Sequence, residues 1–243
     1  PGSIVFSMDY AEGLMLACVA GAMLAVERRR WLLAGILAGV ATAVGPVALA
    51  IVPAALAVCV RELHRNGWRA RDGWGAAPFP LLAPVGIVTF GAYLWARVGT
   101  PFASYISQQD AWQEHSSPFA LYDQARTLFD EIFHPAPGVP PPSLNIIVGL
   151  LGLVFLVWGL SSVWRARRSV PLVAVAWTLG VTFLTITSAQ VPPNPRMLLC
   201  AFPILIVLAA RLEGRAYRRL IAATTVLLVG LSVLTFVSTS LRP

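Results

Sequence analysis

Long apolar runs, repeated along the whole chain, constrain this sequence more than any other feature. A helix that crosses a membrane needs about 20 consecutive, mostly apolar residues, and runs of this kind recur throughout the sequence. Charged residues make up only 12% of the 243 residues and the mean hydropathy is +0.73, whereas a soluble domain carries about 25% charged residues. The sequence therefore predicts an all-α, polytopic membrane protein.

Eight apolar segments are predicted to be helices of a transmembrane bundle, near residues 10–26, 31–45, 47–60, 78–96, 144–164, 171–189, 197–210 and 219–239. The second and third are short and are separated by Gly45-Pro46, where proline lacks the amide proton of a continuous helix and disfavours a helical Gly45. We expect these two segments to form a buried hairpin; a single kinked helix is the alternative. Since no polar linker divides the chain, residues 1–243 are predicted to form one transmembrane domain.

The placement of arginine predicts the orientation of these helices. With eight helices, four arginine-rich loops fall on one side of the membrane and hold 14 of the 18 arginines: 27–30, 61–72, 165–168 and 211–219. Arginine in short loops favours the cytoplasmic side, so we expect these loops in the cytoplasm and residues 97–143 as one long extracytoplasmic loop of a cell-membrane protein. The net charge of +7 could indicate nucleic-acid binding. Because most of the arginines lie in loops on one side of the membrane, we expect them to face the lipid bilayer and not nucleic acid.

The long loop contains one segment with helical periodicity. Ser117-Pro118 resembles an N-cap followed by proline at the first helical position. After it, apolar residues recur at helical spacing: Tyr122, Ala125, Phe129, Ile132 and Phe133. We expect residues 118–134 to form an amphipathic helix that lies in the membrane interface, followed by an extended proline-rich run at 135–142.

Few polar residues on the expected outer side could carry chemistry. Asp9 and Glu12 are three residues apart and would share a helix face; they form either a capping box or a pair of carboxylates that lines a site. Arg196 precedes an apolar helix, where it either extends its charged end to the interface or binds a phosphate. Gln109 and Trp112 belong to a polar segment that is either a solvated loop with an interfacial tryptophan or part of a binding site.

Four segments of the chain resemble PIG-V-type mannosyltransferases: residues 1–16 (PGSIVFSMDYAEGLML), 31–56 (WLLAGILAGVATAVGPVALAIVPAAL), 104–119 (SYISQQDAWQEHSSPF) and 194–209 (NPRMLLCAFPILIVLA). This family belongs to the GT-C class of polytopic enzymes, which transfer a sugar from a polyprenyl-phosphate carrier on the extracytoplasmic side. The resemblance implies substrate-binding roles for Tyr10, Gln109, Trp112 and Arg196, and a catalytic role for Glu12, with Asp9 beside it. No cofactor or metal is expected.

The sequence departs from the family pattern at two positions. Gly45 stands where the family usually has arginine before the proline, and Met197 stands where tyrosine usually follows the arginine. The family also places its key acidic residue in a first luminal loop, so we expect a further N-terminal portion before Pro1 and expect residues 1–243 alone to be an inactive piece. The alternative function is a non-enzymatic membrane protein: a transporter or flippase domain, or an accessory subunit.

Overall fold

The protein is helical throughout the part of the chain that can be described. The computed structural model describes residues 11–67, 74–100, 102–112, 115–134, 144–189 and 193–237. Within these ranges all regular structure is helical, apart from one isolated antiparallel bridge between Ser116 and Ser188. The prediction of an all-α chain is confirmed.

Three helical stretches are long and apolar enough to cross a membrane: Pro46–Asn66, Pro78–Val98 and Ile147–Ala166. Large apolar side chains remain exposed on them; Leu151, Val154 and Val157, for example, are at least 60% exposed. An exposed apolar surface of this kind is typical of a helix that faces lipid. The described residues therefore support an integral membrane protein, and the count of eight spanning helices stays a prediction.

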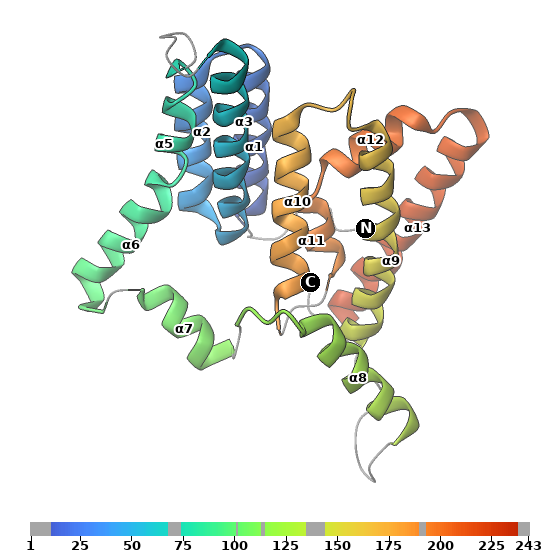
Figure 1. The fold of residues 1–243 in the computed structure, drawn as a ribbon. Helices are drawn as coiled ribbons and strands as arrows, with labels where there is room; N and C mark the ends of the chain where they lie inside the picture. Colours follow the sequence, from blue (N-terminus) through green and yellow to red (C-terminus); the bar gives the residue numbers. More distant parts are fainter. Residues whose placement is uncertain are drawn as a thin grey trace. The chain divides into compact units, whose positions relative to one another are not determined.

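The chain forms two compact units, each described here by itself (Figure 1). Unit 2 comprises residues 10–111 and 166–181, and unit 1 comprises residues 1–9, 112–165 and 182–243. The single domain predicted for residues 1–243 stays a prediction.

Unit 2 is built on the hairpin of α1 (Glu12–Glu27) and α2 (Trp31–Val44). Gly45 is extended and ends α2, and the 3-10 helix η2 (Pro46–Ala50) leads directly into α3 (Ile51–Asn66). The chain then continues through α5 (Pro78–Leu82), α6 (Val85–Val98) and α7 (Ala103–Trp112). The break predicted at Gly45-Pro46 is confirmed, since α2 ends at Val44. Its physical cause is that proline cannot donate the hydrogen bond that would continue the helix.

Glycines on α2 and α6 allow α2 to pack against α5 and α6 at backbone contact. A Cβ atom added at Gly35 would lie 2.6 Å from the carbonyl oxygen of Pro78, and one added at Gly86 would meet the backbone oxygen of Gly39. At the same crossing, the buried Thr42 hydroxyl donates to the carbonyl oxygen of Ala83 at 2.7 Å. Small residues and a hydrogen bond between helices are the usual basis of packing inside a membrane.

Unit 1 contains α8 (Ala120–Phe133), α9 (Leu144–Ala166), the end of α10 (Leu172–Thr187), α11 (Pro195–Cys200), α12 (Pro203–Arg211) and α13 (Gly214–Val237). Glycines again allow close packing, here on one face of α9. A Cβ atom added at Gly152 would meet the carbonyl oxygen of Pro193, and one added at Gly159 would meet the side chain of Ile204. The face of α9 that holds both glycines therefore packs against the α11–α12 region.

Several predicted helix ends were wrong. α3 continues from Val60 to Asn66, and α13 begins at Gly214, so most of the arginines assigned to the adjacent loops lie on helices. Arginine and glutamate are good helix formers, which explains how the helices extend into charged sequence. The segment predicted as one helix at 197–210 is divided into α11 and α12 just before Pro203, and the segment at 78–96 is divided near Pro84.

The predicted extracytoplasmic loop contains two helices. Residues 103–112 form α7, which was predicted as loop. The helix predicted at 118–134 is present as α8, with Phe119 as its N-cap; the Ser117 hydroxyl accepts a hydrogen bond from the Phe119 amide in the turn before the helix. The proline-rich run 135–142 lies outside the described residues.

Candidate functional site

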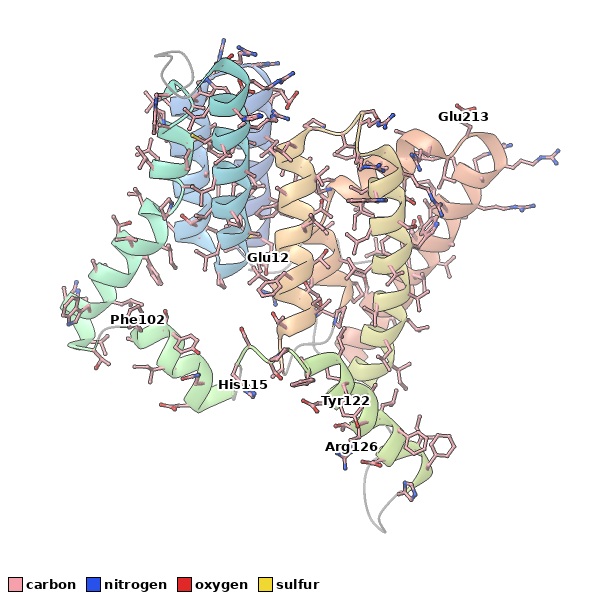
Figure 2. All side chains as sticks on the ribbon, in the orientation of Figure 1. Glu12, Phe102, His115, Tyr122, Arg126 and Glu213 are labelled. Carbon is pink, nitrogen blue, oxygen red and sulfur yellow. The ribbon has the colours of Figure 1, made fainter. Side chains whose placement is uncertain are left out.

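The predicted carboxylate pair lies at the start of α1. Glu12 is the first residue of this helix and is half-buried, and Ala11 occupies the N-cap without a side-chain hydrogen bond (Figure 2). The capping box, one of the two alternatives for Asp9 and Glu12, involves Asp9 and is therefore not tested by the described residues. Asp9 and Tyr10 lie outside the described residues, so their predicted roles stay predictions.

Gln109 and Trp112 share one face of α7, since three residues separate them on the helix. The Gln109 side-chain amide donates to the Tyr105 hydroxyl at 2.9 Å, one helical turn away, and both side chains are exposed. The side chain of Trp112 is outside the described set. Tyr105, which sequence reasoning missed, therefore orients Gln109.

Arg196 lies inside α11, although it was predicted to lie just ahead of a helix. Asn194 is the N-cap, and its side-chain oxygen accepts a hydrogen bond from the Met197 amide at 2.9 Å, while Pro195 occupies the first turn. An asparagine N-cap followed by proline is a strong helix start. Arg196 is half-buried and lies on the first turn of α11. Pro193, just before this helix, packs against Gly152 of α9.

Residues 115–117 and 187–189 pair as two short antiparallel segments, which we call the loop pairing. The Ser117 amide donates to the carbonyl oxygen of Thr187 at 2.8 Å, and the Ala189 amide donates to that of His115 at 3.0 Å. His115, labelled in Figure 2, marks this point of the chain. The loop pairing connects the start of α8 to the end of α10.

Gln124 of α8 strengthens the loop pairing. Its side chain is buried, and its amide nitrogen lies 3.1 Å from the carbonyl oxygen of Ser188 and 3.3 Å from that of Ala189. Its side-chain oxygen is also buried and has no hydrogen-bond partner among the described residues. Sequence reasoning missed Gln124 because one glutamine in an amphipathic segment carries no signal of a contact more than 60 residues away.

The structure thus places the predicted residues in two groups. Glu12 and Gln109 belong to unit 2 and Arg196 belongs to unit 1, and the division between the units falls just before Trp112, the last residue of α7. The catalytic role implied for Glu12 and the substrate-binding role implied for Arg196 stay predictions. Among the described residues, no group of three or more His, Cys, Asp or Glu side chains could hold a metal ion.

Comparison with protein families, with curated proteins and with solved structures finds no match for this chain.

Proposed function

We propose that this protein is a membrane glycosyltransferase of the mannosyltransferase-like GT-C type, which transfers a sugar from a polyprenyl-phosphate carrier to an extracytoplasmic acceptor. In this proposal Arg196 binds the carrier phosphate, and Glu12, with Asp9 beside it, accepts the proton of the acceptor hydroxyl. Tyr10, Gln109 and Trp112 contact the sugar or its carrier. The proposal rests on the sequence resemblance together with one structural observation.

That observation is the loop pairing. Trp112 precedes His115 by three residues, and Arg196 follows Ala189 by seven. Hydrogen bonds join His115, which belongs to the segment 104–119, to Ala189, which precedes the segment 194–209 by five residues. We infer from this pairing that the segment 104–119 and the start of the segment 194–209 contribute to a common site.

The proposed chemistry suits these side chains. A sugar on a phosphate carrier already has a good leaving group, so a site needs mainly a base for the acceptor hydroxyl and a cation for the departing phosphate. General-base catalysis contributes about 10²–10⁴-fold, and the planar guanidinium of arginine binds phosphate through two hydrogen bonds. Glu12 and Arg196, both of which are half-buried residues, carry the side chains that these roles need.

The proposal includes a topology of about eight membrane spans, with the arginine-rich loops in the cytoplasm and residues 97–143 outside the cell membrane. It can be tested with single cysteines at positions 72 and 113, labelled in intact cells by a reagent that does not cross the membrane. We expect labelling at position 113 only. Labelling at position 72 only would refute the topology.

The functional test measures donor binding as well as transfer. Membranes with the protein expressed from its own gene are photolabelled with a polyprenyl-phosphate sugar that carries a photoreactive group. Arg196→Ala should reduce labelling at least tenfold, about the contribution of one charged hydrogen-bonded pair, and Glu12→Gln should reduce transfer but preserve labelling.

Arg126→Ala is the matched control, because Arg126 is an exposed arginine of the same unit, with its side chain 68% exposed. Labelling should be unchanged in this variant. Equal labelling of the wild type, Arg196→Ala and Arg126→Ala would refute the carrier site and favour the non-enzymatic alternative.

A further inference from the structure

Five arginines gather at one end of unit 2, at the opposite end of α1 from Glu12. Three belong to the turn between α1 and α2, and two to the last turns of α3; we call them the arginine cluster: Arg28, Arg29, Arg30, Arg61 and Arg65. Figure 2 shows nitrogen-tipped side chains at this end of α1 and α3. All but Arg61 are exposed.

A buried carboxylate organises the cluster. The Glu62 side chain is only 7% exposed, and guanidinium nitrogens of Arg29, Arg61 and Arg65 lie 3.8–3.9 Å from its oxygens. These distances are longer than a direct N–H···O hydrogen bond of about 2.7–3.2 Å, so the guanidinium groups are attracted to Glu62 without using their N–H donors on it. The Nε atom of Arg61 is itself buried and has no hydrogen-bond partner among the described residues.

Arg29 occupies a backbone position at which glycine is favoured. The amides of Arg29 and Arg30 donate to the carbonyl oxygens of Val26 and Ala25, which is the Schellman pattern at a helix C-terminus. Arg29 is the left-handed residue of this motif, with φ of 55°. Residues with side chains rarely adopt this conformation, so an arginine here indicates that its side chain has a use.

The charge of the cluster exceeds what Glu62 can balance. The five arginines outnumber the two carboxylates of Glu27 and Glu62, so these seven side chains carry a net charge of +3. Trp31, at the start of α2, packs beside this end of α3 against Cys59 and Leu63. Tryptophan is enriched at the level of lipid headgroups, so the cluster has the charge and the depth to meet a headgroup.

We propose that the arginine cluster is a binding site for the phosphate of an anionic phospholipid headgroup, with Glu62 holding three guanidinium groups around it. Arginine is suited to this task because its fork of N–H donors matches phosphate oxygens. The cytoplasmic leaflet is rich in anionic lipids, which attract clusters of arginine next to the membrane. This inference does not depend on sugar transfer, but it rests on the cytoplasmic side that the proposed topology gives to the arginine-rich loops.

The test measures phosphatidylglycerol binding to the purified full chain in detergent by native mass spectrometry, with phosphatidylcholine as the uncharged comparison. Arg29→Gly is the decisive variant, because it removes the guanidinium and supplies the residue that the turn favours. If Arg29 served only the turn, this change would leave lipid binding intact. We expect affinity for phosphatidylglycerol to fall about fivefold, the effect of one arginine near a lipid surface.

Arg218→Gln is the matched control, because it removes one exposed arginine from α13 on the same predicted side of the membrane; its affinity should be that of the wild type. Arg28→Gln is a second test variant, should Arg29→Gly fail to fold, and is expected to weaken binding in the same way. Wild-type affinity in the folded test variant, or an equal loss in Arg218→Gln, would overturn the proposal. Equal binding of phosphatidylcholine, or displacement of the lipid by inorganic phosphate at matched concentration, would also overturn it.

Discussion

Replacing Gly86 by alanine should separate α6 from α2. A Cβ atom at Gly86 would meet the carbonyl oxygen of Gly39 and would lie 2.6 Å from the amide nitrogen of Ala43 and 2.7 Å from the hydroxyl oxygen of Thr42. Two of these atoms belong to the α2 backbone, which cannot rotate away as a side chain can. The two helices must therefore move apart.

The expected cost has two parts. Overpacking a well-packed interior costs about 1–3 kcal/mol. Separation of the helices also lengthens the 2.7 Å hydrogen bond from Thr42 to Ala83, and such bonds between membrane helices contribute about 0.6 kcal/mol on average. We expect Gly86→Ala to lower the free energy of unfolding by about 2–3 kcal/mol.

Gly91→Ala is the matched control, since Gly91 lies on the same helix and an added Cβ atom would meet nothing within 4 Å. This variant should be unchanged or more stable by up to about 1 kcal/mol, the helix-propensity difference between glycine and alanine. Unfolding of the purified protein by an ionic detergent, followed by circular dichroism, gives both free energies. Equal values for the two variants would refute the close crossing of α2 and α6.

Three further predictions concern unit 1. Gly152→Leu should displace the turn before α11 and reduce donor photolabelling, whereas Gly230→Leu should not, because an added Cβ atom at Gly230 meets nothing within 4 Å. Gln124→Leu should remove the side-chain hydrogen bonds to the loop pairing, lower stability by about 1–2 kcal/mol and speed amide exchange there; unchanged exchange would contradict this role. If α8 lies in the interface with its apolar face down, a spin label at Phe129 should lie deeper in a lipid bilayer than one at Asp130, and equal depths would exclude that placement.

The helical regions could be predicted because apolar runs in a membrane protein give a strong local signal. Helix ends were harder, since hydropathy falls at Arg61 although the helix continues to Asn66. The signal for the true end was Gly67 itself, whose positive φ of 82° is a value that favours glycine over residues with a side chain. Glycine at position 67 and the helix propensity of residues 61–66 therefore mark this helix end, whereas hydropathy does not.

The candidate site was less accessible to prediction, because its geometry depends on contacts between distant segments. Arg196 could be selected from its charge and its neighbours. The loop pairing could not, since it joins the backbones of residues 115–117 and 187–189, and backbone hydrogen bonds of this kind leave no mark on residue type. Gln124 is buried by the same contacts, although its own segment is mostly exposed.

The number of arginines in a loop predicts its side of the membrane but does not explain why an arginine occupies position 29. The predicted topology uses only the number of arginines in a loop, and a loop with glycine at position 29 and arginine at 28 and 30 would still be positive. Such a loop would avoid the left-handed arginine, whose conformation costs about 1 kcal/mol or more. The ion pair of Arg29 with Glu62 is long, at 3.9 Å, and its guanidinium is 71% exposed, so the pair contributes little by itself. Neither topology nor the ion pair accounts for an arginine at this position, and recognition of an anion by the whole cluster does.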